Sequence, residues 1–344
     1  MIKVLEDDQG RVHVTPLTDG RLQLSAEATA DYVHPPHSPC VTDYTQELVE
    51  RIFECYGSIY TCDEISRDVD NTEAALDVRY ATIAYLDDAQ MSKPLRILDY
   101  GCGAGSSTLT LARLFPNAEI SGCDYAARLL EIARMRAEHY ALHNLSFAAV
   151  PADGANQGAV AEFDIAFLNA VFEHLLPRER PLVLESIWRS LKPGGILVLN
   201  QTPHRWFPIE THTSGLPLVN YLPDVMAHWA IGRYCRRSVR GHAWEELLRA
   251  GVRGATVQEI MSRIRSIDAA AERMACKRVS PNWPGIWYEA KQARVHKIQS
   301  SVVRTAIAVT GRFVGWTGLP FTPYINIAIQ KSDGTTPHRT DGKL

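Results

Sequence analysis

The chain has 344 residues, which is enough for one large domain with insertions or for two smaller domains. Apolar residues make up 46% and charged residues 22%, as in ordinary globular proteins, and a net charge of −3 at pH 7 gives no basic field to attract nucleic acid. The sequence has no apolar run near the roughly 20 residues of a membrane span, no signal-peptide pattern at its start and no C-x-x-C among its seven cysteines. These features predict a cytoplasmic protein without a disulfide framework or zinc ribbon.

Residues 1–90 are predicted to form an N-terminal extension. Short β runs separated by DDQG and LTDG indicate a β-ribbon over residues 1–25. Apolar residues recur at helical spacing between residues 43 and 56, and a second helix is predicted over residues 72–89 with Asn71 as its N-cap. These helices either cover the mouth of a ligand site or pack on the edge of a sheet, and the two roles are compatible.

His34, His37 and Cys40 stand three residues apart between the ribbon and the helices, a spacing that raises the question of a metal site. Prolines at positions 35, 36 and 39 hold this stretch extended, so the three side chains do not share a helix face. No second ligand pair lies nearby in the sequence. We predict a rigid linker here and no metal site.

The segment at residues 95–113, LRILDYGCGAGSSTLTLAR, combines a short apolar strand, an acid, three alternate glycines and the start of a helix. This order fits a βα turn at the carboxyl edge of a parallel sheet, where open α/β sheets bind ligands. Glycine lets the backbone approach a ligand and adopt positive φ, and the free N–H groups of the new helix point toward that ligand.

The register of this loop argues against a dinucleotide. A dinucleotide site has G-x-G-x-x-G, whereas this loop has G-x-G-x-G and places Ser106 where the third glycine would stand. Asp99, just before the loop, would repel a pyrophosphate and better suits a ligand with an ammonium group. The segment D-x-G-C-G-x-G resembles motif I of the class I S-adenosylmethionine-dependent methyltransferases. The resemblance implies S-adenosylmethionine as cofactor, bound by Asp99, Gly101, Gly103 and Gly105.

Three further positions follow predicted strands of the same sheet. Asp124 ends the second strand, where a carboxylate can accept hydrogen bonds from both ribose hydroxyls. By the resemblance, Asp153 would contact the adenine amino group, with Gly154 in the same PADG segment, although a plain turn fits that segment nearly as well. Asn169 ends the fourth strand, in a region that borders cofactor and acceptor in the family, whereas the nearby His174 reads as a capping or packing residue.

The segment LKPGGILVLNQTP supplies a second signature. A helix over residues 178–191 ends at K-P, two glycines make a turn, and a buried fifth strand follows at residues 196–199. K-P-G-G before an apolar strand is typical of these methyltransferases. The predicted fold is α/β, with a doubly wound, mostly parallel seven-stranded sheet, an N-terminal β-ribbon and helical extension, and insertions after strands five and six. Its predicted parts are the methyltransferase domain at 91–331, insertions at about 201–240 and 262–323, and a flexible tail at 332–344.

The stretch at residues 201–223 leaves the carboxyl end of a central strand, so we expect it to overhang the active site. This stretch contains the pattern P-x-R-x-x-P-x-E-x-H, which resembles segments of methyltransferases acting on sugars and on small lipid-linked or secondary metabolites. Three roles remain open for its polar residues. His204 or His212 serves as the base of an O-methyl transfer with Glu210 orienting it, Glu210 and His212 bind a divalent ion, or the loop is a lid alone.

Beyond this loop, a helix is predicted over residues 242–250, a sixth strand over 255–260, and a last strand, antiparallel by family analogy, at YINIAIQK. Residues 301–316 read as an amphipathic helix that covers the core, forms a homodimer interface or rests on a membrane surface. The sequence as a whole predicts methyl transfer from S-adenosylmethionine to a small molecule, with oxygen on a sugar, lipid-linked intermediate or secondary metabolite favoured. The alternatives are a non-catalytic cofactor-binding regulator and an NAD-dependent oxidoreductase. Nucleic-acid methylation is disfavoured because no N-P-P-Y or D-P-P-Y follows the fourth strand.

Overall fold

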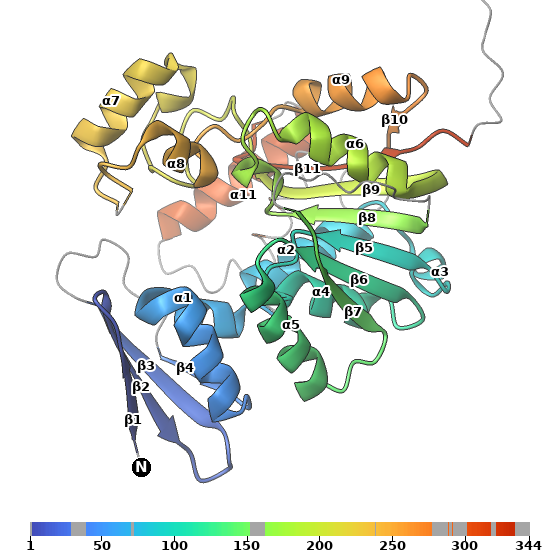
Figure 1. The fold of residues 1–344 in the computed structure, drawn as a ribbon. Helices are drawn as coiled ribbons and strands as arrows, with labels where there is room; N and C mark the ends of the chain where they lie inside the picture. Colours follow the sequence, from blue (N-terminus) through green and yellow to red (C-terminus); the bar gives the residue numbers. More distant parts are fainter. Residues whose placement is uncertain are drawn as a thin grey trace, which may run out of the picture.

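The structure is a computed structural model that places the chain in two β-sheets with helices around them (Figure 1). It describes residues 2–28, 39–69, 72–151, 162–237, 239–276, 288, 291, 301–317 and 321–333. Asp153 and Gly154, two of the predicted cofactor residues, lie outside the described residues.

The first sheet is antiparallel and has the order β1-β2-β3-β4. Its strands are β1 (Lys3–Glu6), β2 (Gly10–Pro16), β3 (Leu22–Ala28) and β4 (Cys40–Thr42). Alternate residues of β2 and β3 point to one face, as strand geometry requires, and pack on the buried residues of helix α1 (Gln46–Ser66). Helix α1 therefore lies between this small sheet and the rest of the molecule. Figure 1 shows the small sheet and α1 in blue.

The second sheet has seven strands in the order β10-β11-β9-β8-β5-β6-β7. The bounds are β5 (Arg96–Tyr100), β6 (Glu119–Asp124), β7 (Leu145–Ala149), β8 (Phe163–Asn169), β9 (Leu191–Pro203), β10 (Glu272–Arg273) and β11 (Tyr324–Gln330). The five strands from β9 to β7 are parallel, whereas β11 pairs antiparallel with β9. The predicted mostly parallel seven-stranded α/β sheet is confirmed.

Helices cover both faces of this sheet. One core cluster joins α6 and α9 to the strands, and another joins α2 and α4 to the opposite face. Besides α1, the described residues form further helices and two 3-10 helices, η1 and η2. The bounds of these helices are α2 (Glu73–Ile83), α3 (Asp88–Met91), α4 (Ser106–Leu114), α5 (Ala127–His139), η1 (Phe172–His174), α6 (Arg180–Ser190), η2 (Val219–Tyr221), α7 (Asp224–Tyr234), α8 (Trp244–Arg249), α9 (Val257–Ile267) and α11 (Ser301–Thr317). Figure 1 shows α7 and α8 lying together to one side of this sheet.

Two local predictions were wrong. Residues 255–260 are not a strand, because helix α9 begins at Val257 with Thr256 as its N-cap and buries Ile260 and Ile264 on one face. The N-cap of α2 is Thr72 rather than Asn71, because the Thr72 hydroxyl accepts a hydrogen bond from the backbone N–H of Ala75.

Helix α11 exposes three large apolar side chains, Val309, Phe313 and Trp316, the last of which is 85% exposed. Arg304 and Arg312 on the same helix are also exposed. Among the described residues, no helix is long and apolar enough to cross a bilayer.

Candidate active site

The glycine loop after β5 adopts a conformation that other residues would not tolerate. Gly101, Gly103 and Gly105 have φ angles of 74°, 52° and 88°, in the left-handed region. A Cβ atom at Gly101 would lie 2.6 Å from the Val171 side chain, and one at Gly105 would lie 2.8 Å from Ala133 Cβ. A Cβ at Gly103 would meet only the Tyr56 hydroxyl, at 3.9 Å. Two of the glycines therefore permit close packing, and Gly103 leaves open space beside the backbone for a ligand.

A cavity of about 200 Å³ opens in front of this loop, at the carboxyl ends of β5, β8 and β9. Helices α1 and α2 form its other wall. Its lining residues are Tyr56, Glu64, Arg67, Ala74, Val78, Gly101, Cys102, Gly103, Ala104, Ser106, Ser107, Asn169, Ala170 and Gln201. The predicted loop glycines 101 and 103 and Asn169 thus share one cavity, as expected for an α/β ligand site.

Asp99 lies behind the wall of this cavity and not on its surface. Its carboxylate is 1% exposed and accepts hydrogen bonds from the Ser107 and Thr108 hydroxyls, at 2.6 and 2.7 Å, and from the Asn169 side-chain amide at 3.2 Å. Burial raises the pKa of Asp99, and the three hydrogen bonds oppose that rise. Asp99 therefore ties β5 to α4 and β8, so the predicted direct contact with an ammonium group is corrected to a positioning role.

Asp124 connects the glycine loop to the start of α5. One carboxylate oxygen accepts a hydrogen bond from the Gly103 N–H and the other accepts one from the Ala126 N–H, both at 2.9 Å. Each oxygen keeps a further lone pair, so Asp124 can still accept hydrogen bonds from a ligand at Gly103. The side chain is largely buried, with 7% of the residue exposed.

Arg67 is a cavity residue that the sequence analysis missed. It follows the last turn of α1, and its guanidinium lies 3.6 Å from the Asp63 carboxylate and 3.7 Å from that of Glu64. Arg67 is the one cation among the described residues that line this cavity, and neither of its ion pairs is a close one. In the sequence, an arginine at the end of an amphipathic helix reads as an ordinary solvated charge, so no local signal marked it.

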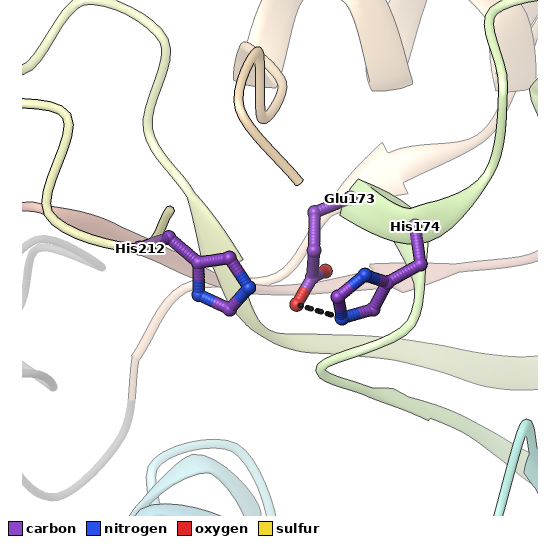
Figure 2. A group of neighbouring side chains, drawn as sticks. All are labelled: Glu173, His174 and His212. Atoms are coloured by element: carbon purple, nitrogen blue, oxygen red, sulfur yellow. Dashed lines mark ion pairs between the residues drawn. The ribbon is translucent and has the colours of Figure 1, made fainter. Parts of the chain in front are cut away.

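A second polar cluster lies near the same edge of the sheet. The side chains of Glu173, His174 and His212 converge, with their nitrogen and oxygen ligand atoms all within 4.8 Å of one another (Figure 2). Glu173 and His174 belong to η1, directly after β8, and His212 comes from the loop after β9. Burial raises the pKa of Glu173 to about 7, and burial together with the nearby His174 and Arg237 lowers the pKa of His212 to about 4.

The other two residues of the predicted catalytic set have different surroundings. Glu210 accepts hydrogen bonds from the backbone N–H groups of residues 212, 213 and 214 and from the Ser214 hydroxyl. Glu210 therefore holds the loop in shape, and the predicted pairing with His204 is corrected. His204 is 6% exposed, its Nδ1 donates to the Thr322 carbonyl at 3.3 Å, and it is not among the residues lining the cavity.

Replacing Glu173 with glutamine should change how stability depends on pH. Because the folded pKa of about 7 lies above the ordinary value of 4.5, ionisation favours the unfolded state, and the stability present below pH 4.5 is lost as pH rises through 7. In chelator-containing buffer, we expect the free energy of unfolding of Glu173→Gln to rise by about 3 kcal/mol relative to that of the native protein as pH increases from 4.5 to 8. Urea unfolding of both proteins across this range measures the difference, and parallel stability curves would contradict it.

The fold and this glycine loop define a Rossmann-like class I methyltransferase domain. A family described as "Methyltransferase domain" matches residues 91–249. The chain carries a domain of the S-adenosylmethionine-dependent methyltransferases, and S-adenosylmethionine is the cofactor of that domain. The open space at Gly103 beside Asp124 fits this cofactor.

Several curated relatives share this domain. The carboxy-S-adenosyl-L-methionine synthase of Photobacterium profundum is 32% identical over 31% of this chain and 43% of that protein. The ubiquinone biosynthesis O-methyltransferase of Cereibacter sphaeroides is 33% identical over 40% of this chain and 62% of that protein. The demethylmenaquinone methyltransferase of Lactococcus lactis is 26% identical over 60% of this chain and 77% of that protein. The chain spans less than half the length of the first relatives it matches, with coverage of 43%, 36% and 49%.

Proposed function

We propose that this protein transfers a methyl group from S-adenosylmethionine to an oxygen atom of a small molecule. The observation that carries the proposal is the cavity that Gly103 lines, where the Gly103 N–H donates to Asp124 and a Cβ at Gly103 would meet only the Tyr56 hydroxyl of α1. The predicted acceptor classes are sugars, lipid-linked intermediates and secondary metabolites.

Two residues of this chain account for two parts of the cofactor. Asp124 would accept hydrogen bonds from the ribose hydroxyls, and Arg67 would bind the carboxylate of the methionine portion through charge-assisted hydrogen bonds. The cofactor supplies an activated methyl group on a sulfonium, so the protein needs to position the acceptor and exclude water. Tyr56 and Val78, from α1 and α2, close the cavity on the side facing the loop.

The acceptor would enter from the ends of β8 and β9. Asn169 and Gln201 line the cavity there, and the polar cluster of Glu173, His174 and His212 follows the same two strands. Polar groups of this kind suit an acceptor whose hydroxyl loses a proton during transfer, which favours oxygen over carbon. The relatives' names include an O-methyltransferase and the demethylmenaquinone methyltransferase, so the acceptor atom needs a direct test.

The test is formation of S-adenosylhomocysteine from S-adenosylmethionine with a panel of small hydroxyl compounds, carboxylic acids and quinols. We expect turnover with at least one hydroxyl acceptor and a product whose mass is increased by one methyl group. Stoichiometric cofactor binding with no product from any acceptor would favour the alternative of a non-catalytic regulator. Stabilisation by NAD and not by S-adenosylhomocysteine would favour the oxidoreductase alternative.

Arg67 offers a specific prediction about the cofactor. Removing its charged hydrogen bonds in Arg67→Ala should cost about 1.5–3 kcal/mol of binding, which is roughly a 10- to 150-fold increase in the Kd for S-adenosylhomocysteine. Methylthioadenosine lacks the amino acid portion, so its Kd should be the same for the variant and the native protein. Equal losses for both ligands would contradict the assignment of Arg67 to the carboxylate.

Helix α11 remains the predicted site of any contact with a membrane surface or a second copy of the chain. Its exposed Val309, Phe313 and Trp316 are consistent with either partner. Cytoplasmic localisation likewise stays a prediction.

A further inference from the structure

Glu173 is a carboxylate that folding has buried without a hydrogen-bond partner. The residue is 0% exposed, and neither side-chain oxygen has a hydrogen-bond partner within 3.5 Å among the described residues, although the neighbouring Thr202 hydroxyl helps to lower its pKa. Nε2 of His174 lies 3.8 Å from Oε1 of Glu173, which is beyond hydrogen-bonding distance. Burying an unpaired carboxylate costs free energy. The position of Glu173 therefore indicates that a positively charged partner is missing.

Two imidazoles face this carboxylate from different elements. Figure 2 shows the rings of His174 and His212 on opposite sides of Glu173. The Nδ1 atom of His174 lies 2.6 Å from the Arg249 carbonyl. A carbonyl only accepts, so Nδ1 carries the hydrogen and Nε2 is left to bind a ligand. Metal-binding histidines commonly have this arrangement, in which a backbone carbonyl fixes the tautomer and the ring orientation.

The geometry leaves room for an ion. Ligand atoms about 2.1 Å from a transition metal lie roughly 3.0–3.5 Å from one another, so the present spacing of up to 4.8 Å has to close by about an ångström. The residue that allows the approach is Gly251, where a Cβ atom would lie 2.7 Å from the His212 ring and 3.3 Å from Glu173 Cγ. The His174 side chain is 44% exposed, which leaves the cluster open to solvent on one side.

We propose that Glu173, His174 and His212 bind one divalent transition-metal ion whose open coordination positions hold an oxygen of the methyl acceptor. Two imidazoles and one carboxylate are a ligand set suited to Zn²⁺, Co²⁺ or Fe²⁺ with positions left for other ligands. Glu173 and His174 come shortly after Ala170, which lines the cofactor cavity. The ion would therefore lie on the side of this cavity from which the methyl acceptor enters. Metal binding by these residues is independent of the proposed function, and only the role toward the acceptor rests on it.

The experiment is a titration of the chelator-treated full chain with Co²⁺, followed by its visible absorption and by competition with Zn²⁺. We expect one equivalent to bind, and we expect Glu173→Gln and His212→Ala each to raise the Kd at least about tenfold. His228→Ala is the matched control, because that histidine lies on α7 and bonds the His242 carbonyl outside the cluster. It should bind Co²⁺ as the native protein does.

Two outcomes would overturn the proposal. One is the absence of Co²⁺ binding by the native chain. The other is binding that Glu173→Gln leaves unchanged, for example with a thiolate absorption band that places the ion on cysteines such as Cys40 and Cys62. Glu173→Gln conserves side-chain volume, so it carries the test if His212→Ala fails to fold. Titration of the same samples with S-adenosylhomocysteine separates the two proposals, because retained cofactor binding without metal binding removes only the metal site.

Discussion

Replacing Arg136 with methionine should destabilise the protein by about 3–5 kcal/mol, the cost of leaving a buried charge without its partner. Arg136 is fully buried, and its guanidinium donates to the Glu64 carboxylate at 2.9 Å and to the backbone carbonyls of Ala104 and Glu64. Burial alone would lower the pKa of Arg136, but Glu64, Tyr44, Asp68 and Tyr56 together outweigh it and the net pKa is raised. One side chain on α5 thereby holds α1 against the glycine loop.

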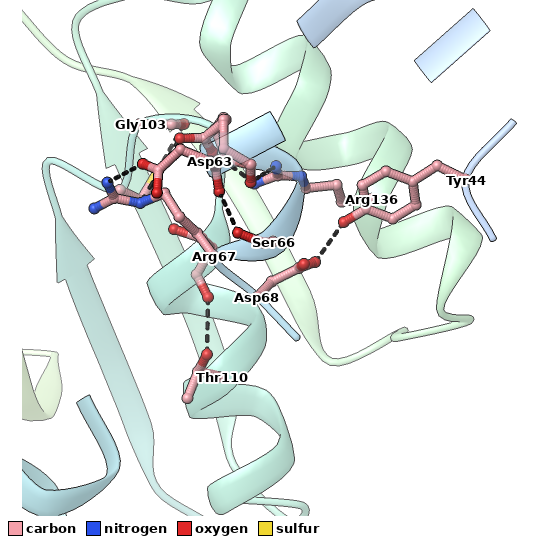
Figure 3. Close-up of polar contacts among 12 residues, drawn as sticks. Tyr44, Asp63, Ser66, Arg67, Asp68, Gly103, Thr110 and Arg136 are labelled. Carbon is pink, nitrogen blue, oxygen red and sulfur yellow. Dashed lines mark hydrogen bonds and ion pairs between the residues drawn. The ribbon is translucent and has the colours of Figure 1, made fainter. Parts of the chain in front are cut away.

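The wider network explains why the effect should be large. Figure 3 shows Arg136 beside Tyr44 and Asp68, where the Tyr44 hydroxyl donates to the Asp68 carboxylate. Because Glu64 lines the cofactor cavity, Arg136→Met should also weaken S-adenosylhomocysteine binding. Urea unfolding provides the measurement of stability.

A surface pair provides the matched control for Arg136. Arg51 and Glu54 are 3.0 Å apart on α1 but about half exposed, so Arg51→Met should leave stability nearly unchanged. The double variant Arg136→Met with Glu64→Gln removes both charges and should recover part of the loss. Equal effects of Arg136→Met and Arg51→Met would show that the buried pair is not what holds α1 in place.

Gly105→Ala should abolish useful cofactor affinity while leaving a folded protein. Its left-handed φ of 88° costs about 1–2 kcal/mol for a residue with a Cβ. The added methyl would also lie 2.8 Å from Ala133 Cβ and 3.1 Å from Ala133 Cα, which is backbone and cannot rotate away. Overpacking of this kind typically costs a further 1–3 kcal/mol. Displacing the loop from α5 moves the Gly103 amide away from Asp124, so we expect the Kd for S-adenosylhomocysteine to rise more than about 100-fold.

Gly20→Ala separates backbone strain from crowding. Gly20 has a similar φ of 85°, but nothing lies within 4 Å of the Cβ it would gain. This control should cost only the strain, about 1–2 kcal/mol, and leave cofactor affinity unchanged. Calorimetric titration of both variants with S-adenosylhomocysteine compares their cofactor affinities. Comparable cofactor affinity in Gly105→Ala and Gly20→Ala would show that the contact with Ala133 does not shape the site.

The strand-loop-helix unit from β5 to α4 could be predicted because its signals act over a few residues. Apolar runs, alternate glycines and helix starts are local, and the parallel order of the strands follows from their spacing by helices. The strand predicted at residues 255–260 was wrong, although helix signals stand in the same segment. Thr256 and Glu259 form the T-x-x-E pattern of a helix start, and Ile260 and Ile264 have helical spacing.

The polar cluster could not be predicted in the same way. Glu173 and His174 follow one strand and His212 lies in the loop after the next, so only the sheet brings them together. The sequence predicts a role for His212 together with Glu210, its neighbour in the chain. The structure shows that Glu210 is occupied by backbone N–H groups of its own loop. Arg67 was missed for a related reason, because its cavity forms between α1 and a loop distant in the chain.

The most direct test of the account is calorimetric titration of the native chain with S-adenosylhomocysteine and, separately, with NAD. We expect one S-adenosylhomocysteine bound per chain, no detectable NAD binding, and loss of S-adenosylhomocysteine affinity by about 1–3 kcal/mol in Asp124→Ala. Binding of NAD in place of S-adenosylhomocysteine, or binding of S-adenosylhomocysteine that Asp124→Ala leaves unchanged, would contradict it.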